Sequence, residues 1–465
     1  MSEVGSEEQP LRVAIIGSGP AGFYTVSNFL KHKDIHVEMD MFDRLPTPFG
    51  LVRAGVAPDH QKYKTVTRAY DKSAQSDNFR FYGNVAYGDD VSLDMLRDYY
   101  HQIIFCTGAS SDRNLGIAGE DLVGSHSATD FVAWYNGHPD YVDAQFDLSQ
   151  ESAAIIGLGN VAIDVARILC KTDNELKNTD MADHALEALR NSNVKTVYVL
   201  GRRGPAQAAF TPPEIKEMAE LEDTDVTILV DEATIDDASR AEMEASGDKN
   251  VAKNVAAIEA MSAASPTAKG KHLTIRFLVS PTEIIEKDGK VSAIKIVKNE
   301  AYQDESGGIR ARATNIEETI PVGLVFRSVG YRGVALPEIP FHDAWGTVHN
   351  KAGRVTEESG EIVPGVYVAG WIKRGPTGVI GTNKTDAQET VACMVEDLKA
   401  GKILNPGNPD VNALDEFIRA KQPDVVSYED WTKIDEVEVA KGEASDRPRV
   451  KFTRIAQMLE VLGRE

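Results

Sequence analysis

Three glycines spaced G-x-G-x-x-G near the start of the chain limit the possible folds more than any other feature. Gly17, Gly19 and Gly22 follow the apolar run of residues 13–16 and precede a helical pattern over residues 23–31. At such a strand-to-helix junction the first glycine allows a tight turn, the second lets the backbone approach a pyrophosphate, and the third lets the helix pack on the strand. The free N–H groups at the helix start then favour phosphate. The pattern predicts a dinucleotide-binding unit.

An acidic residue ends the next predicted strand of this unit. Residues 36–42 have strand character, and Asp43 follows them. A carboxylate at this point bonds the ribose 2′-OH of NAD or FAD and repels a 2′-phosphate. Residues 44–60 come next, and their prolines and glycines exclude a regular element, but their apolar side chains favour an ordered loop beside the cofactor. Asp59 is expected to cap a helix over residues 60–73.

A second unit begins with the same order of features. Residues 153–156 are apolar, residues 157–162 read G-x-G-x-x-A, and an amphipathic helical pattern follows. After the next predicted strand, residues 196–200, the chain carries Arg202 and Arg203 in place of an acid. Two charge-assisted hydrogen bonds of about 1.5–3 kcal/mol each would favour NADPH over NADH by roughly a hundredfold or more. The alternative reading is a solvated basic turn.

Further strand patterns complete both units. The first unit is expected to include strands at residues 79–82, 84–87 and 103–106 and a helix at residues 92–99. The second unit is expected to include strands at residues 273–279, 282–285, 291–297 and 320–326. The apolar run at residues 364–371 and the helical pattern after it then return to the first unit. The second unit therefore interrupts the first.

The charge and apolar content of the chain argue against two classes of partner. The formal net charge of −22 over 465 residues argues against nucleic acid. No apolar run approaches the roughly 18 residues that a membrane-spanning helix needs, so no membrane partner is expected. Residues 1–10 resemble neither a signal peptide nor a transit peptide and are expected to form a short disordered tail. The acidic stretch of residues 217–248 is expected to be a solvated surface insertion, with a partner surface as the alternative.

The cysteines restrict the route that electrons can take. Cys106, Cys170 and Cys393 lie in apolar or helical patterns, and no two are spaced C-x-x-C. They are expected to be small buried hydrophobic residues in a cytoplasmic protein. A disulfide reductase needs a redox-active cysteine pair, and an iron–sulfur protein needs clustered cysteines. The two fingerprints therefore predict a flavoprotein that takes hydride from NADPH and reduces a small-molecule oxidant or a redox protein outside the chain.

Several longer blocks resemble one known family, the adrenodoxin reductase-type ferredoxin–NADP⁺ reductases. The matching blocks are residues 46–53, 55–60, 157–167, 201–205, 209–211 and 370–383. The resemblance runs from about residue 12 to about residue 400. It implies an α/β fold with two Rossmann-like domains, in which the FAD domain is discontinuous and interrupted by the NADP domain. The implied parts are a tail (1–10), a first FAD segment (11–108), an NADP domain (109–332) and a second FAD segment with a helical C-terminal tail (333–465).

The fingerprints and the resemblance together assign roles to individual residues. For FAD these residues are Gly17, Gly19, Pro20, Ala21, Gly22, Asp43, Leu51, Val85, Gly370, Trp371, Gly378, Val379 and Ile380. For the NADP pyrophosphate they are Gly157, Gly159, Asn160 and Val161, and for its 2′-phosphate Arg202 and Arg203. The resemblance implies that His60 and Glu214 line the nicotinamide site, with Glu214 beside the ribose. Stacking and distance mainly govern hydride transfer, so both are treated as positioning or proton-handling groups. No metal site is expected.

One region departs from the family pattern. Animal members dock an acidic ferredoxin on basic residues of the NADP domain, but here residues 231–244 are acidic, with Arg240 almost alone. Either the docking surface uses basic residues near the flavin or the partner differs. The candidates near the flavin are Arg53, Lys62, Lys64, Lys373, Arg374 and Lys384.

Three functions therefore stay open at the level of sequence. The first is a reversible ferredoxin–NADP⁺ reductase that passes electrons from NADPH through FAD to an acidic ferredoxin-type iron–sulfur protein in one-electron steps. The second is an NADPH:quinone or dye oxidoreductase. The third is a non-catalytic binding protein on a flavoprotein scaffold. A monomer and a dimer are both compatible with the sequence.

Overall fold

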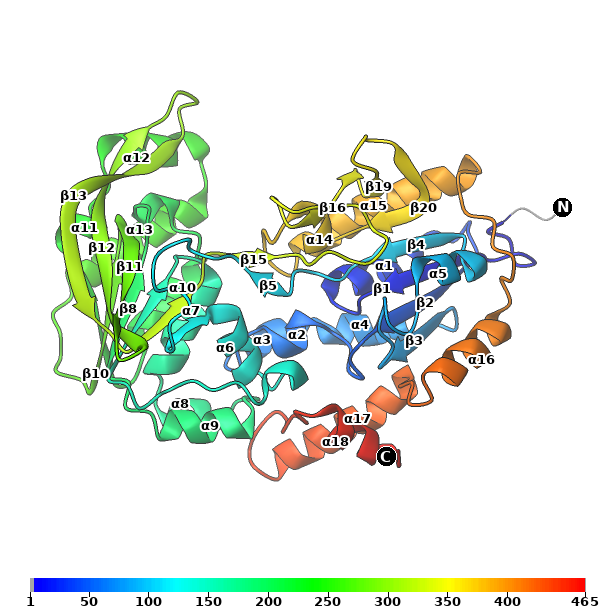
Figure 1. Cartoon of the computed structure of the whole chain (residues 1–465), viewed down its shortest axis with the longest axis horizontal. Coiled ribbons are helices and arrows are strands. Elements are labelled where there is room, and N and C mark those ends of the chain that lie inside the picture. Colours follow the sequence, from blue (N-terminus) through cyan, green and yellow to red (C-terminus); the bar gives the residue numbers. More distant parts are fainter. Residues whose placement is uncertain (1–3, 465) are drawn as a thin grey trace. The chain divides into compact units, whose positions relative to one another are not determined.

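The chain forms two compact units. The computed structural model describes residues 4–464, with residues 4–56, 60–111 and 331–464 in unit 1 and residues 57–59 and 112–330 in unit 2. The chain passes from unit 1 to unit 2 between residues 111 and 112 and returns between residues 330 and 331. The boundaries expected from the sequence were 108/109 and 332/333. The sequence did not predict that residues 57–59 belong to unit 2. Each unit has a parallel sheet and its own core, which confirms the predicted α/β fold class (Figure 1).

Unit 1 is built on a seven-stranded, largely parallel sheet. Its strands are β1 (Leu11–Ile16), β2 (Val37–Asp43), β3 (Phe79–Gly83), β4 (Gln102–Phe105), β18 (Asn350–Lys351), β19 (Arg354–Thr356) and β20 (Ile362–Val368). Their order is β18-β19-β20-β4-β1-β2-β3, and β18 and β19 pair antiparallel. Every residue of β1 is buried, which explains its uninterrupted apolar run, because parallel strands are covered on both faces. A separate hairpin contains β16 (Phe341–His342) and β17 (Thr347–Val348).

Helices cover this sheet. They are α1 (Pro20–Phe29), α2 (Leu51–Ala54), α3 (Gln61–Lys64), α4 (Thr67–Ala74), α5 (Leu93–Tyr99), α14 (Trp371–Arg374), α15 (Thr382–Lys399), α16 (Val411–Lys421), α17 (Tyr428–Glu443) and α18 (Ile455–Val461). α1 and α15 pack against each other, so the helix after the second FAD segment lies beside the helix of the first fingerprint (Figure 1). The helix expected at residues 60–73 is divided into α3 and α4. The strand expected at residues 84–87 is wrong, because Asn84 has a left-handed φ of 60° that breaks extended structure.

Unit 2 contains a six-stranded, fully parallel sheet in the order β6-β14-β7-β8-β10-β9. Its strands are β6 (Ser125–Ser127), β7 (Ser152–Ile156), β8 (Thr196–Leu200), β9 (Thr224–Ile228), β10 (Lys271–Arg276) and β14 (Leu324–Arg327). Its helices are α6 (Ala128–Tyr135), η1 (Pro139–Tyr141), α7 (Asn160–Cys170), α8 (Asp173–Leu176), α9 (Asp183–Arg190), η2 (Pro205–Gln207), α10 (Pro212–Ala219), α11 (Val230–Ala233), α12 (Asp237–Ser246) and α13 (Lys249–Ser262). β5 (Ser111–Asp112) and β15 (Tyr331–Arg332) lie where the chain passes between the units.

A three-stranded antiparallel meander completes unit 2. It contains β11 (Val279–Lys287), β12 (Lys290–Gln303) and β13 (Ile309–Pro321), which lie side by side in Figure 1. Asp288 and Gly289 join the first two strands with left-handed φ values of 54° and 77°, as a two-residue hairpin turn requires. The single strand expected at residues 320–326 is wrong. The run is shared between the end of β13 and β14, because Val322 and Gly323 turn the chain from the meander into the parallel sheet.

Two expectations about polar segments also need correction. Residues 4–10 are not a disordered tail, because Gly5 N–H donates to the Gln9 carbonyl (2.8 Å) and the Gly5 carbonyl accepts from His36 N–H (2.7 Å). Residues 1–3 of that expected tail lie outside the described residues. Residues 217–248 are not a simple solvated insertion. β9 pairs with β10 in the sheet, and Glu232 of α11 is buried, whereas α12 is mostly exposed.

The cysteines have the environment that was expected for two of them. Burial raises the pKa of the Cys106 and Cys170 thiols to about 12 each. Cys393 on α15 is half-buried, and burial raises its pKa as well. Among residues 4–464, no helix has the length and apolar character needed to cross a bilayer.

Candidate dinucleotide-binding sites

The first glycine turn lies between β1 and α1 and has the shape of a phosphate cradle. A Cβ on Gly17, whose φ is +108°, would meet the Cys106 carbonyl at 2.6 Å, and a Cβ on Gly22 would meet the Gly17 carbonyl at 2.3 Å. A Cβ on Gly19 would meet no heavy atom within 4 Å. Gly19 also caps α1 without a side-chain hydrogen bond, so the first amides of the helix keep their donor capacity. Open space beside uncapped amides fits a pyrophosphate.

Asp43 lies at the end of β2, as the fingerprint requires. Its Oδ2 accepts hydrogen bonds from the backbone N–H (3.0 Å) and the hydroxyl (2.5 Å) of Ser18, and its Oδ1 accepts from Leu45 N–H (3.0 Å). These bonds hold the carboxylate beside the glycine turn. Val85 has no exposed surface, and its N–H donates to the Asp43 carbonyl (2.9 Å). In this structure Val85 therefore supports the end of β2.

The second part of this site follows β20. Gly370 has a φ of 83°, and its N–H donates to Asp386 of α15 (2.5 Å). The Trp371 indole N–H donates to the Thr377 carbonyl (3.2 Å). Gly378 (φ +79°) and the exposed Val379 lead into α15, whose N-terminus has no side-chain cap. This end of α15 carries the positive end of a helix dipole, which suits an electron-rich ligand.

The C-terminal helices hold the loop that follows Asp43, a role that no sequence motif indicated. Glu438 of α17 has no exposed surface and accepts two hydrogen bonds from Arg53 (2.8 and 2.5 Å). Arg53 also lies over the Trp431 ring at 5.2 Å, and its carbonyl accepts from Lys451 (3.1 Å). Upstream in the same loop, Phe49 N–H donates to the Ser18 carbonyl (3.0 Å). The tail therefore stabilises the loop that carries Leu51, which is 36% exposed.

The second glycine turn, in unit 2, repeats the first. Gly157 has a φ of +140°, and a Cβ there would meet the Ser328 carbonyl at 2.2 Å. A Cβ on Gly159 would meet nothing within 4 Å, and Gly159 caps α7 without a side-chain hydrogen bond. The Asn160 side-chain oxygen accepts from Thr211 N–H (2.9 Å), which joins the start of α7 to the start of α10. Val161 is partly buried against the core. This turn also fits a pyrophosphate.

Arg202 and Arg203 follow β8, at the point in unit 2 where unit 1 has Asp43. Both side chains are exposed. Within residues 4–464 neither guanidinium forms an ion pair with a carboxylate. Two adjacent cations without a protein counter-charge suit a phosphate dianion.

A buried arginine that belongs to no nucleotide fingerprint organises the polar side of α7. Arg167 has no exposed surface and contacts Asp164 (2.6 Å), Glu214 (2.9 Å) and Asp59 (2.8 Å). Burial alone would raise the pKa of Asp59, but the charges of Arg167 and Lys171 outweigh it and lower that pKa below its ordinary value. The available signal was Asp164 and Arg167, two charges one turn apart in a helical pattern that is otherwise apolar, because such charges need partners.

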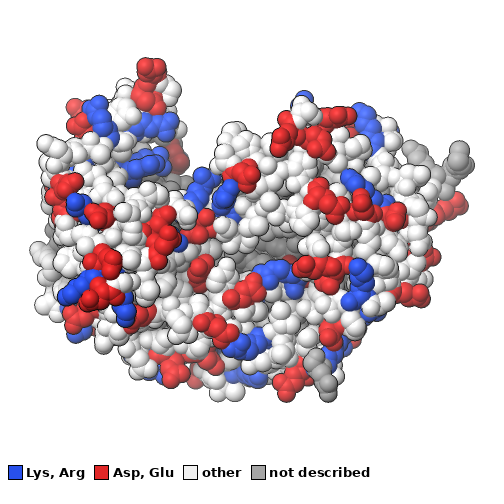
Figure 2. All heavy atoms as spheres, viewed as in Figure 1, with Lys and Arg blue, Asp and Glu red and all other residues white. Residues whose placement is uncertain are grey.

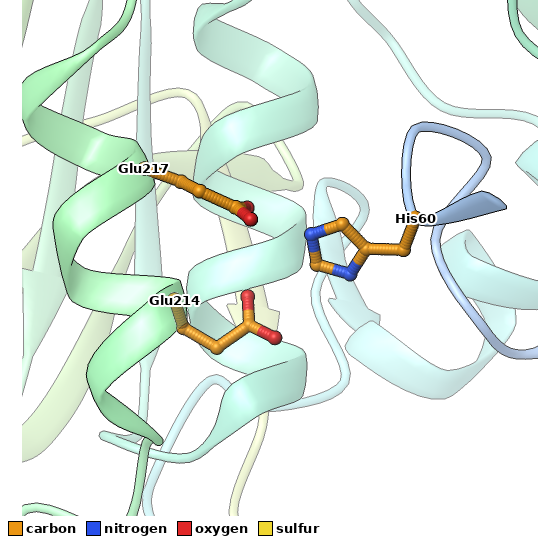
Figure 3. A group of neighbouring side chains, drawn as sticks. All are labelled: His60, Glu214 and Glu217. Atoms are coloured by element: carbon orange, nitrogen blue, oxygen red, sulfur yellow. The ribbon is translucent and has the colours of Figure 1, made fainter. Parts of the chain in front are cut away.

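This network corrects one expectation, the capping role of Asp59. Asp59 does not cap the following helix, because its carboxylate binds Arg167 and Lys171 (2.8 Å). Glu214 is almost buried on α10, with Oε2 held by Arg167. Figure 3 shows that Glu214 and Glu217 project from the same side of α10. His60 belongs to unit 1 and precedes α3.

The basic residues proposed for docking fall into two groups. Arg53 is bound to Glu438, Lys373 is bound to Asp386 (3.2 Å) and Glu389 (2.5 Å), and Arg374 donates to Asn383 (3.1 Å). These three cations are half-buried and already have protein partners, which argues against a docking role for them. Lys62 and Lys384 are exposed, and Lys64 is half-buried. The face seen in Figure 2 has acidic and basic side chains interspersed.

Comparison with known proteins agrees with this geometry. The family model described as pyridine nucleotide-disulphide oxidoreductase matches residues 11–252. The NADPH-ferredoxin reductase FprA of Mycobacterium leprae is 44% identical over 97% of this chain and 98% of its own length. The mitochondrial NADPH:adrenodoxin oxidoreductase of Homo sapiens is 38% identical over 98% of this chain and 93% of its own.

A solved structure gives the same result. Mycobacterium tuberculosis FprA in complex with NADPH superimposes with a TM-score of 0.92 at 43% identity, over 97% of this chain and 99% of that one. The chain therefore belongs to the family of NADPH-ferredoxin reductases and NADPH:adrenodoxin oxidoreductases, among the pyridine nucleotide-disulphide oxidoreductases.

Proposed function

We propose that this protein is an FAD-dependent oxidoreductase that transfers electrons from NADPH to a ferredoxin-type iron–sulfur protein. The observation that carries the proposal is the pair of open glycine turns, one beside Asp43 and one followed by Arg202 and Arg203. A carboxylate matches the ribose of FAD, and two arginines match the 2′-phosphate that distinguishes NADPH from NADH. The names of the relatives support NADPH as the electron donor and the same kind of acceptor.

Unit 1 would hold the FAD. Gly17, Gly19 and Gly22, with Pro20 and Ala21, would face the pyrophosphate, and Asp43 would bond the ribose. Leu51, Gly370, Trp371 and the segment Gly378, Val379 and Ile380 would lie against the ring system, at the uncapped end of α15. When bound, FAD accepts a hydride and can release electrons one at a time. The loop held by Glu438 would help to exclude water from this side of the site.

Unit 2 would hold the NADPH. Gly157, Gly159, Asn160 and Val161 would face its pyrophosphate. Glu214 would lie near the nicotinamide ribose, with its carboxylate oriented by the bond from Arg167 to Oε2. From the family resemblance, we assign His60 a positioning or proton-handling role at the nicotinamide. Since hydride transfer depends on distance and alignment, buried polar contacts that fix side chains contribute through geometry.

The electron acceptor must lie outside the chain. Cys106 and Cys170 are buried with raised pKa values, and no cysteine pair is spaced for a disulfide. A ferredoxin-type protein matches the relatives' names, and an acidic ferredoxin is the form that we propose. Lys62 and Lys384 are the exposed cations of the earlier candidate set that stay available to it.

An anaerobic visible titration tests this proposal. Purified protein should be yellow and should be bleached by roughly one equivalent of NADPH and far less readily by NADH, because two charge-assisted contacts are worth about a hundredfold. A ferredoxin added to the same cuvette should then be reduced. A colourless protein that refuses FAD would contradict the proposal. Rapid turnover with quinones, unchanged by ferredoxin, would point to a small-molecule reductase instead.

A further inference from the structure

The loop that carries the two exposed arginines is bound to the rest of unit 2 through three successive carbonyl groups. The Gly201 carbonyl accepts from Val279 N–H (2.9 Å), and the Arg203 carbonyl accepts from Leu278 N–H (3.2 Å). The Arg202 carbonyl accepts from the side-chain amide of Asn299 (2.9 Å). Two of the three donors are backbone groups, which any residue supplies. The third depends on the amino acid at position 299.

Asn299 is built into the sheet in a way that directs its side chain. It lies on β12, 9% exposed, next to a register shift between Val297 and Asn299 in the pairing with β13. Such a bulge re-aims a side chain relative to a regular strand. The side-chain amide donates to the Arg202 carbonyl and to the Ser280 hydroxyl (2.8 Å). Both of its N–H donors are therefore used.

The segment that faces the loop is itself held in place. Asn299 N–H donates to the Leu278 carbonyl (2.7 Å), and Leu278 has a left-handed φ of 53°. The preceding residue, Phe277, donates its N–H to the buried carboxylate of Glu232 (3.0 Å). That carboxylate also binds Arg276 at 2.8 Å. Asn299 thus joins the arginine loop to a backbone segment whose conformation is fixed by a buried ion pair.

We propose that Asn299 is a positioning residue for the 2′-phosphate of NADPH and a determinant of the preference for NADPH over NADH. By holding the Arg202 carbonyl toward the sheet, it leaves the guanidinium groups of Arg202 and Arg203 directed to solvent and ordered before the ligand arrives. An arginine loop that is already ordered loses less conformational entropy when the nucleotide binds. This inference rests on the proposed NADPH site, and Asn299 itself contacts the protein, not the nucleotide.

The test compares Asn299→Ala and Asn299→Leu in the FAD-loaded protein. Leucine keeps the number and branching of the side-chain heavy atoms and removes both donors, so it separates loss of the hydrogen bond from a cavity. Thr314→Val is the matched control. The Thr314 hydroxyl, on β13, donates to the carbonyl of Lys298 (2.8 Å), which precedes Asn299 on β12. Calorimetry with 2′,5′-ADP and 5′-AMP measures the phosphate contribution directly, and thermal unfolding measures stability.

Both Asn299 variants should bind 2′,5′-ADP about tenfold more weakly, as loss of one well-made hydrogen bond predicts. Their KM for NADPH should rise in parallel, with kcat, the KM for NADH and 5′-AMP binding unchanged. Thr314→Val should match the unaltered protein. Unchanged 2′,5′-ADP binding in the Asn299 variants, or an equal rise in the KM for NADH and for NADPH, would overturn the role of Asn299 and leave the proposed NADPH site intact. An unaltered protein that does not distinguish 2′,5′-ADP from 5′-AMP would overturn the NADPH site as well.

Discussion

The first two glycines of the first glycine turn, Gly17 and Gly19, have different physical roles. Gly17 has a left-handed φ of +108°, and a side chain there would meet the Cys106 carbonyl at 2.6 Å. Gly19 has a φ of −76°, and a side chain there would enter space with no heavy atom within 4 Å. The first glycine is required by the fold. The second is required by the ligand that occupies the open space.

Alanine at each position should therefore give opposite results. Gly17→Ala should lower the free energy of unfolding of the FAD-free protein by about 1–3 kcal/mol, since a left-handed residue with a Cβ is strained. Gly19→Ala should cost the FAD-free protein about 1 kcal/mol or less. Its FAD affinity should nonetheless fall by at least about tenfold, because the methyl group occupies the phosphate position.

Denaturant unfolding of the FAD-free protein and flavin absorbance per chain measure the two effects separately. Equal destabilisation by both substitutions would contradict the distinction, as would full FAD content in Gly19→Ala.

Arg167 shows what a residue pattern leaves undetermined. Its place in a helix that is otherwise mostly apolar indicates a buried charge, but its partners come from three separate segments. Asp164 is one turn away on the same helix, whereas Asp59 and Glu214 are distant in sequence. No local spacing rule identifies such partners, because only the packing of α7 against α10 and residues 57–59 brings them together.

Among the secondary-structure elements, α17 has the clearest unassigned role. Glu438 is fully buried and binds Arg53, Arg449 (3.2 Å) and the N–H of Phe452 (2.8 Å). Burial favours the neutral form of Glu438, but Arg53 and Arg449 lower its pKa and keep it charged. A helix near the C-terminus thereby stabilises a loop near the N-terminus that contacts the first glycine turn.

Glu438→Gln should weaken both the tail and the flavin site. Removing the buried anion leaves two arginines without their shared partner, which costs about 3–5 kcal/mol. The rate of FAD release should increase, because the loop with Leu51 loses its support. Glu436→Gln changes an exposed residue on the same helix and is the matched control.

Urea unfolding and the appearance of free flavin fluorescence after dilution are the measurements. Normal flavin retention in Glu438→Gln would show that the tail stabilises the fold without acting on the site.

The parallel strands were the most predictable elements, and the segments between them were the least. β1, β4, β7 and β8 were expected where they occur, since strands buried on both faces require continuous apolar runs. β9 was missed because it is an edge strand in an acidic stretch, where Asp225 is bound by the backbone N–H groups of Thr267 (2.9 Å) and Lys269 (2.9 Å). The high density of charged residues suggested that this stretch is exposed to solvent, but hydrogen bonds from residues distant in sequence stabilise the Asp225 carboxylate.

For the protein as a whole, electrons should pass from NADPH to the acceptor without using a thiol. The cysteines are all free, and two of them are buried with raised pKa values that disfavour the reactive thiolate. Iodoacetamide should therefore label at most Cys393 in the native protein and leave ferredoxin reduction unchanged. Labelling of all three should require denaturation. Loss of activity in step with labelling of Cys106 or Cys170 would contradict this route.

The sequence by itself determined the two nucleotide units, their order and the difference between Asp43 and the arginine pair. These features are local: a turn, a helix start and a strand end lie within a few residues of one another, so spacing encodes their geometry. Only the tertiary structure decided which side chains support them. Arg53 and Glu438 are 385 residues apart, and Arg202 and Asn299 are 97 apart. Such contacts depend on strand order and on packing of distant segments, which no periodicity in the chain records.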